Sequence, residues 1–320
     1  DVAVGEPAIP IVWGTDAVHG HSNIIGATIF PHNVGLGATR DPELIERIGQ
    51  VTAVEIRVTG QEWTFAPTVA VPQDYRWGRA YEGYSSDPAL VASYVGSMIR
   101  GLQGPPSTKP ILSGPHVAAS TKHFLADGAT TDGKDQGDAA ISEIELRLIH
   151  GAPYLPAMEN GVATVMTSFS SWNGVKLSAH RGLVTDVLKG RMNFDGMVIT
   201  DWNAHGQVAG CSNASCPRAV DAGIDMFMAP DSWRSLYNST LAEARDTLHW
   251  PYARWRVPVE DAFRLFSDLP GTIAGAIYQY WIAKRFGEDG RPLLPTIAMA
   301  DFEARHISMA PNKQSEPEVA

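Results

Sequence analysis

Residues 196–208 read GMVITDWNAHGQV, and the rest of the chain is best understood from this segment. The apolar run MVIT predicts a buried parallel strand, which ends at Asp201 and Trp202. In parallel α/β folds the carboxyl ends of the strands carry the functional residues, so this acid and indole suggest a nucleophile or base beside a stacking platform. The alternative is that Asp201 only caps the following helix. This segment alone favours neither interpretation.

Outward from this segment, strand-like and helix-like segments alternate along most of the chain. Further strands are expected to begin near Ile9, Glu62, Ser120 and Gly161, and the segment DMFMAP gives a sixth. Aspartate–proline pairs start two of the expected helices, which is typical of an N-cap followed by proline in the first turn. The expected helices cover residues 41–60, 87–102, 141–160 (interrupted by prolines), 181–189, 217–225 and 236–246.

Six strands that alternate with helices imply an α/β fold with a parallel sheet, most economically a (β/α)8 TIM-like barrel. We expect this barrel to cover residues 1–246. The strand–helix alternation stops there, and residues 247–320 are expected to form a divergent C-terminal extension that is helical or partly disordered.

The amino-acid composition indicates which kinds of molecule the chain could bind. The chain has 320 residues, a formal charge of −10 and 44% hydrophobic residues, as expected for a globular protein. The acidic balance argues against nucleic acid or an anionic membrane as a partner and favours a neutral or cationic ligand. No apolar run reaches the roughly 18 residues of a membrane span. The first residues, DVAVGEPAIP, lack a signal-peptide pattern, so we expect neither a targeting nor an anchoring segment.

The sequence has two cysteines, Cys211 and Cys216, which flank the short polar segment SNAS. A local disulfide fits them better than a metal site, because no neighbouring histidine or further cysteine completes a tetrahedral set. This pairing favours an oxidising compartment.

Every expected strand end carries polar side chains. The clusters are Asp16 and His19; Arg76, Trp77, Arg79 and Glu82; Lys122, His123 and Asp127; Ser168–Asn173; and Asp201 with Trp202. Each member alone is more simply explained as a packing residue or a surface ion pair. Their recurrence at one end of successive strands is improbable by chance, and Lys122–His123 is unexpected in an apolar strand because unpaired charge there is costly. Such a rim suits a polyhydroxylated ligand.

Six segments carry a resemblance to a known family. They are IVWGTDAVHGHSN, DYRWGRAYEGYSSDP, TKHFLADG, SFSSWNG, VITDWNAHG and AGIDMFMAPDSW, and they occur in the order found in glycoside hydrolase family 3. The chain resembles this family over roughly residues 1–245, with the greatest similarity to bacterial exo-acting β-glucosidases of the plant β-glucan exohydrolase type. The resemblance implies removal of terminal β-D-glucose from β-glucosides and cello- or gluco-oligosaccharides, with neither metal nor organic cofactor.

The resemblance also implies roles for individual residues. Asp201 matches the catalytic nucleophile, and Trp202 matches an aromatic wall of the sugar site. The residues that match those holding the non-reducing-end glucose are Asp16, Arg79, Lys122 and His123. A retaining glycosidase needs an ionised nucleophile and a second carboxyl about 5 Å away to protonate the leaving oxygen. By the same resemblance, the location is expected to be periplasmic or extracellular.

The chain departs from the family in four places. The family's first strand and helix have no counterpart, so the barrel is expected to be incomplete at its N-terminus. Phe169 replaces a frequent tyrosine beside the sugar site, and Gln136 replaces a glutamate found in some relatives. The family's second domain, which supplies the acid/base glutamate, also has no counterpart. We therefore expect impaired hydrolysis unless a replacement acid exists, the candidates being Asp127, Asp132, Asp135 and Glu288.

Two alternatives remain open at this point. One is a truncated, inactive or sugar-binding remnant of such an enzyme, for which the expected lack of an acid/base domain argues. The other is a β-N-acetylglucosaminidase of the same family, whose single-domain members place an Asp-Ser-His acid/base in the loop after the Lys–His pair. Here that loop reads DGATTDGKDQGD, without histidine, which argues against the second alternative.

Overall fold

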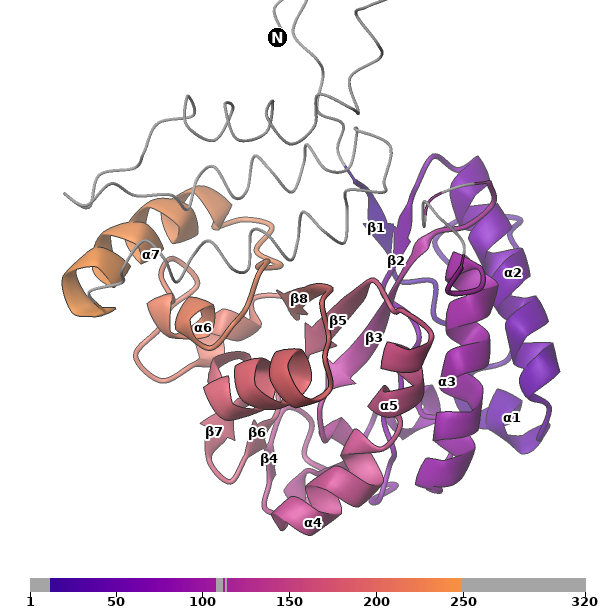
Figure 1. The fold of residues 1–320 in the computed structure, drawn as a ribbon, viewed down its shortest axis with the longest axis horizontal. Helices are drawn as coiled ribbons and strands as arrows, with labels where there is room; N and C mark the ends of the chain where they lie inside the picture. The colour runs from indigo at the N-terminus through magenta and orange to yellow at the C-terminus, as the bar shows by residue number, and fades with distance from the viewer. Residues whose placement is uncertain (1–11, 108–111, 113, 249–320) are drawn as a thin grey trace, which may run out of the picture.

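The computed structural model describes residues 12–107, 112 and 114–248. At its centre five short parallel strands form one sheet in the order β1-β2-β3-β5-β8. The strands are β1 (Gly14–Thr15), β2 (Trp63–Thr64), β3 (Ala118–Phe124), β5 (Thr164–Thr167) and β8 (Met197–Thr200). Helices flank the sheet (Figure 1). This curled parallel sheet with surrounding helices confirms the predicted α/β fold of the TIM-like barrel class.

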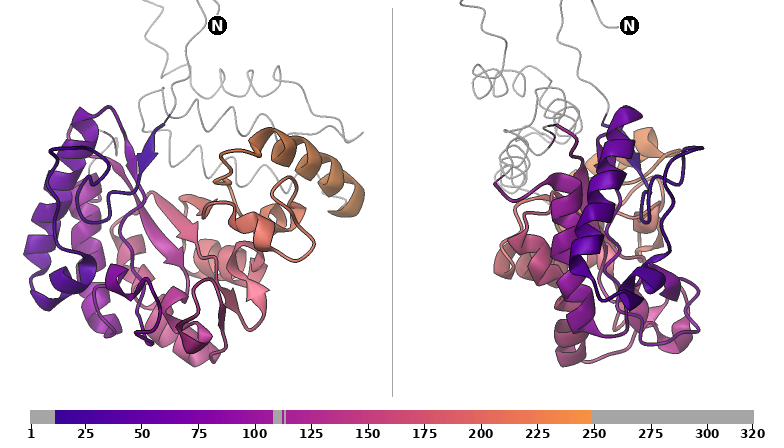
Figure 2. Two further views of the ribbon diagram at one scale, coloured as in Figure 1. Left: turned by 180° about the vertical axis from the view of Figure 1, so that it is seen from behind. Right: turned by 90° about the vertical axis from the view of Figure 1, so that its right-hand side faces the viewer.

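Two long helices, α2 (Pro42–Val58) and α3 (Pro88–Gln103), pack together at one end of the sheet, opposite α7 (Trp233–Leu248; Figure 2). Both begin as the aspartate–proline pairs predict, because Asp41 and Asp87 each accept a backbone N–H of the first turn. The helices approach closely where glycine faces glycine: a Cβ on Gly101 would lie 2.3 Å from a carbonyl of α2 and 2.8 Å from Cα of Gly49.

The remaining elements are shorter. They are α1 (Asn33–Ala38), η1 (Ala80–Glu82), η2 (Asp127–Ala129), η3 (Thr131–Gly133), β4 (Asp138–Ala139), α4 (Glu143–Glu145), η4 (Leu146–Gly151), α5 (Tyr154–Glu159), β6 (Ser171–Trp172), β7 (Val175–Lys176), η5 (Leu177–Ala179), η6 (Gly182–Arg191), η7 (Ala204–Gln207), α6 (Pro217–Asp221) and α7 (Trp233–Leu248). Strands β4, β6 and β7 form a second, small sheet in the loops beyond β3 and β5.

The two faces of the main sheet pack into different clusters. Val165 and Val198 face the helices and belong to the large core that includes α2 and α3. Their strand neighbours Met166, Met197 and Ile199 point the other way into a smaller apolar cluster with Trp63 and Ala118. This alternation is the period-two pattern of a strand buried on both faces.

Three expected elements differ in the structure. The strand expected from residue 62 is paired only at Trp63–Thr64, and Pro67, which has no N–H to donate, interrupts it before an isolated bridge from Thr68 to Lys122. The segment DMFMAP forms only an isolated bridge, from Ile199 to Met226. The helix expected over residues 141–160 is divided into α4, η4 and α5, and the last begins after Pro153.

The C-terminal part of the predicted organisation is largely outside the described residues. The expected helix over residues 236–246 lies within α7. Beyond Leu248 the predicted extension, including Glu288, lies outside the described residues, as does the start of the strand expected at Ile9. Within the described ranges, no helix is both long and apolar enough to cross a membrane.

Candidate active site

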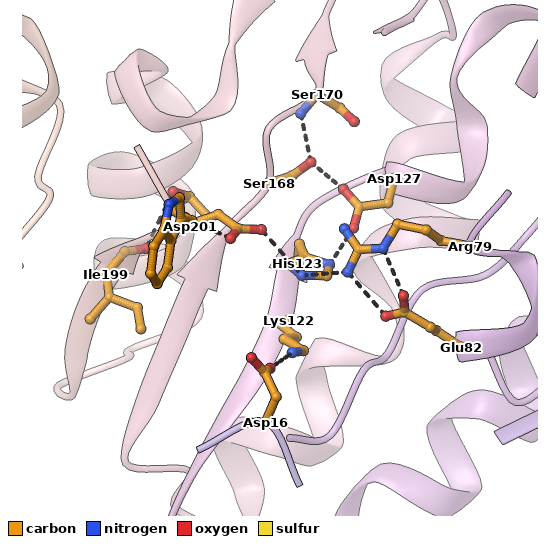
Figure 3. Close-up of polar contacts among 12 residues, drawn as sticks. Asp16, Arg79, Glu82, Lys122, His123, Asp127, Ser168, Ser170, Ile199 and Asp201 are labelled. Atoms are coloured by element: carbon orange, nitrogen blue, oxygen red, sulfur yellow. Dashed lines mark hydrogen bonds and ion pairs between the residues drawn. The ribbon is translucent and has the colours of Figure 1, made fainter. Parts of the chain in front are cut away.

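Strand register brings the predicted site residues to one level. Phe124 pairs with Thr167, and Thr167 pairs with Thr200, so these three residues lie side by side at the carboxyl ends of β3, β5 and β8. Asp201 directly follows β8, and His123 precedes Phe124 on β3. Figure 3 shows the side chains of His123 and Asp201 pointing toward one another.

His123 is the centre of the charged network. Its Nε2 lies 3.2 Å from Nη2 of Arg79 and 3.3 Å from Oδ2 of Asp201. Its other ring nitrogen, Nδ1, lies 2.5 Å from Oδ2 of Asp127. The side chain of His123 is 3% exposed, so these protein groups replace water around the ring. One imidazole therefore connects the loop after β2, the loop after β3 and the end of β8.

The side chain of Asp201 is accessible to solvent and does not cap the helical turn that follows it. Its Oδ1 accepts the backbone N–H of Trp202 at 2.6 Å, and its side chain retains 14% exposure. The next helical turn, η7, is preceded by Asn203, whose side chain makes no cap hydrogen bond. Trp202 is 56% exposed, and an indole in that position offers an open apolar face. The geometry thus gives no support to Asp201 as a helix cap.

Arg79 is fixed by a two-point ion pair with Glu82. Its Nε donates to Oε1 of Glu82 at 2.7 Å, and its Nη2 donates to Oε2 at 3.0 Å. Burial opposes the charged form, but Glu82, with Asp127 and Asp201 nearby, holds the pKa of Arg79 above its ordinary value. The guanidinium is therefore a permanent charge whose fork is oriented before any ligand arrives.

Lys122 and Asp16 form a second charged pair beside this network. Nζ of Lys122 donates to Oδ1 of Asp16 at 2.6 Å. The lysine side chain is 5% exposed and the aspartate side chain 64%, so the pair presents its carboxylate to solvent. Strand β3 supplies the lysine, and the loop after β1 supplies the acid.

Asp127 has a more central position than the sequence predicted. Its side chain is 7% exposed, it pairs with His123, and its Oδ1 accepts a short hydrogen bond from the hydroxyl of Ser168. Burial opposes ionisation, yet His123, Ser168 and Arg79 hold the pKa of Asp127 below its ordinary value. An acid with a lowered pKa has no proton to give at neutral pH, which argues against Asp127 as a replacement general acid. No spacing rule of the sequence pairs them, because His123 is on strand β3 and Asp127 is in the turn η2 that follows it.

The other acids of this loop are engaged at the surface. Asp132 lies 3.2 Å from Nη2 of Arg76 and is 79% exposed. Asp135 accepts the indole N–H of Trp77 at 2.8 Å. Both contacts fit the role of holding the loop better than that of donating a proton to a ligand.

Some predicted rim residues lie outside the network around His123. The ring nitrogen Nδ1 of His19 contacts the carbonyl of Phe30 at 2.8 Å, which makes it a loop contact. Phe169, half-buried, accepts at its backbone carbonyl from Nζ of Lys176 at 2.7 Å. Trp172 stacks on His180 with ring centroids 5.5 Å apart.

Gln136 belongs to a small polar cluster near Phe169. Its side-chain oxygen accepts from Nε2 of Gln207 at 2.6 Å, and Oε1 of Gln207 accepts from Nζ of Lys176 at 2.9 Å. These side-chain hydrogen bonds connect the loops after β3, β5 and β8. An uncharged residue at position 136 thus has a defined partner here.

A disulfide joins Cys211 and Cys216 in the loop between η7 and α6. The backbone carbonyl of Asn213, inside this loop, contacts Nε2 of His205 at 3.1 Å. Since His205 follows Asp201 by four residues, the disulfide loop supports the rim next to the candidate nucleophile. Within the described part of the chain, no three acidic, histidine or cysteine side chains are grouped as a metal site requires.

Comparison with known proteins identifies relatives of this chain. A family model described as the glycosyl hydrolase family 3 N terminal domain matches residues 1–259. A lysosomal β-glucosidase of Dictyostelium discoideum is 33% identical over 239 residues, which is 72% of this chain and 29% of that protein. A periplasmic β-glucosidase of Salmonella typhimurium is 32% identical over 241 residues, which is 74% of this chain and 30% of that protein.

Among solved structures, an exo-1,3/1,4-β-glucanase from a Pseudoalteromonas species is similar, with 44% sequence identity and a TM-score of 0.77. The similarity covers 87% of this chain and 37% of that one. The chain therefore spans only about a third of the length of these relatives.

Proposed function

This chain belongs to glycoside hydrolase family 3, and from that premise we propose that it carries the nucleophile and glucose-binding residues of a retaining exo-acting β-glucosidase. The single observation that carries the proposal is the position of Asp201. It is a carboxylate at the end of a barrel strand, still open to solvent, with His123 and Trp202 beside it. The substrate class would be small β-glucosides and β-linked gluco-oligosaccharides.

In the proposed reaction Asp201 attacks the anomeric carbon, and the glycosidic oxygen leaves with a proton from a general acid. Water then hydrolyses the glycosyl-enzyme and restores the carboxylate. Terminal glucose would lie against the indole of Trp202. The carboxylate of Asp16 would accept hydrogen bonds from the glucose hydroxyls, and the basic residues of β3 would donate hydrogen bonds to them. The half-exposed Asp16–Lys122 pair suits that task, because sugar hydroxyls can replace water on the carboxylate.

The general acid would be none of the three candidate acids in the loop after β3. Asp127 is held ionised, and Asp132 and Asp135 have other partners. General acid catalysis typically contributes about 10²- to 10⁴-fold, and its loss is felt most with a basic leaving group. The proposal therefore predicts measurable cleavage of an activated aryl β-glucoside even where cellobiose is cleaved poorly.

The experiment is to treat the protein with a 2-deoxy-2-fluoro-β-glucoside that carries an activated leaving group. The fluorine slows hydrolysis of the glycosyl-enzyme more than its formation, so the label should accumulate on the peptide that contains Asp201. Asp201→Gly should abolish labelling and aryl glucoside turnover, and added azide should restore turnover with α-glucosyl azide as the product. Asp132→Ala is the matched control and should be labelled like the wild type. A label on another residue would refute the nucleophile assignment.

Two alternatives are separable by the same experiment. A sugar-binding remnant would bind glucose without any labelling. A β-N-acetylglucosaminidase would prefer the N-acetyl substrate, but the loop after β3 has no histidine and its acids are engaged. Relatives named periplasmic and lysosomal, together with the disulfide, support a periplasmic or extracellular location.

A further inference from the structure

Asp127 contacts the candidate site through His123. Its Oδ2 lies 2.5 Å from Nδ1 of His123, and its Oδ1 accepts from the hydroxyl of Ser168. Oγ of Ser168 in turn accepts the backbone N–H of Ser170 at 2.8 Å, which leaves the hydroxyl proton free for Asp127. An ionised carboxylate only accepts hydrogen bonds. The proton between Asp127 and the ring therefore resides on Nδ1.

With Nδ1 protonated, Nε2 is the only ring nitrogen that can change its role. Nη2 of Arg79, at 3.2 Å, can only donate to it, and an ionised Asp201, with Oδ2 at 3.3 Å, can only accept from it. A neutral ring accepts from Arg79, and an imidazolium donates to Asp201. In both states, the orientation of the ring decides which of its nitrogens faces Asp201.

We propose that Asp127 is a positioning residue that keeps the proton on Nδ1 of His123 and thereby holds Nε2 toward Asp201 and Arg79. The inference rests on the proposed function of Asp201 as nucleophile. Ser168 belongs to the same arrangement, because its hydroxyl occupies one oxygen of Asp127 and leaves the other for the ring. Neither Asp127 nor Ser168 needs to touch the sugar to act in this way.

Asp127→Asn tests the proposal with little change in shape. The substitution replaces one acceptor oxygen by an NH2 donor. Because the Ser168 hydroxyl still needs an acceptor, the amide oxygen should face Ser168 and the NH2 group should face Nδ1, which must then lose its proton. NMR of ¹⁵N-histidine-labelled full chain should find Nδ1–H in the wild type and Nε2–H in D127N, with His123→Gln identifying the signal.

Activity gives a second readout. Turnover of an activated aryl β-glucoside should fall about 10²-fold or more in D127N, toward the roughly 10⁴-fold that an Asp-to-Asn change of this kind costs a Ser-His-Asp triad. A wild-type chain without turnover but with the expected ring states would contradict the proposed function alone, because the ring states are measured without substrate. An Nδ1–H ring in D127N would overturn the positioning role.

Ser168→Ala supplies the matched control and a rescue. Alone, it leaves the carboxylate of Asp127 in place, so His123 should keep its Nδ1 proton. In the D127N/S168A double variant the amide is free to turn its oxygen toward the ring, which should restore Nδ1–H and part of the lost turnover. A double variant that stays in the Nε2–H form would overturn the role of Ser168.

The wild type offers a test without any variant. The groups that face His123 are Arg79 from the loop after β2, Asp127 from η2 and Asp201 from the end of β8. At the pH of the activity assay the Nδ1 signal of the wild type should be that of a protonated nitrogen. A wild-type spectrum in which Nδ1 carries no proton would overturn the proposal.

Discussion

Lys122 and His123 are neighbours on β3, yet they join carboxylates in very different surroundings. Lys122 pairs at 2.6 Å with Asp16, whose side chain is 64% exposed. His123 pairs at 2.5 Å with Asp127, whose side chain is 7% exposed. Water can solvate the carboxylate of Asp16 but not that of Asp127. Two contacts of nearly equal length should therefore respond differently to mutation, because solvent exposure decides what an ion pair contributes.

The largest effect on stability is expected for Asp127→Ala. Removing the buried carboxylate leaves the ring N–H of His123 and the hydroxyl of Ser168 without their acceptor, and breaking a buried pair in this way typically costs about 3 to 5 kcal/mol. Urea denaturation at pH 7 would measure the free energy of unfolding. Asp132→Ala, an exposed acid of the same loop, is the control and should change it by less than about 0.5 kcal/mol. Equal losses in the two variants would remove the contrast between buried and exposed acids.

The loss of stability in Asp127→Ala should also depend on pH, which tests whether the buried carboxylate causes it. Since the pKa of Asp127 is lowered on folding, its contribution is complete above the unfolded value of about 3.9 and is lost as pH falls through the lower folded value. The stability difference between wild type and Asp127→Ala should be constant from about pH 7 to 5 and shrink below about pH 4.

A buried histidine acts in a separate pH range. Burial lowers the pKa of His150 to about 4, whereas its ordinary value in an unfolded chain is about 6.5. Between these two pH values the unfolded chain binds a proton that the folded protein does not, so the folded protein loses stability as the pH falls. Both proteins retain His150, but Asp127 itself raises the pKa of this histidine, so the loss should cancel in their difference only above about pH 5, where the folded ring is neutral in both proteins. A difference that already shrinks between about pH 6.5 and 5 would contradict the assignment to Asp127.

Much of the arrangement follows from the sequence because periodicity and capping are local signals. The two Asp–Pro pairs predict the starts of α2 and α3, and strand ends predict that Asp16, Lys122, His123 and Asp201 lie at one rim. Local signals do not predict the small sheet of β4, β6 and β7, because each of its strands has two residues and their pairing depends on distant segments.

Asp127 shows the corresponding limit at the site. It lies in a segment rich in glycine and aspartate, which is typical of turns, and so the sequence suggests a loop acid that could replace the proton donor. The structure buries it instead, because η2 directs its side chain toward His123 and Ser168. Burial of a loop side chain depends on tertiary packing, which residue types in sequence do not report.

The smallest effects are expected at the half-exposed pair, and they should be asymmetric. Asp16→Ala removes an exposed carboxylate but leaves the buried ammonium of Lys122 without that acceptor, which we expect to cost about 1 to 3 kcal/mol. Lys122→Met removes the buried charge, fills its volume with an unbranched apolar chain and leaves Asp16 in water, so it should cost about 1 kcal/mol or less.

The double variant isolates the cause of that asymmetry. Once Lys122 is methionine, Asp16→Ala should add almost nothing, because no buried charge is then left without a partner. Denaturation of the four proteins gives this coupling free energy directly. Both single variants should nevertheless weaken binding of the aryl glucoside, since each removes a group proposed to contact glucose. If Lys122→Met proved as destabilising as Asp16→Ala, exposure of the acid would not explain the difference between the two pairs on β3.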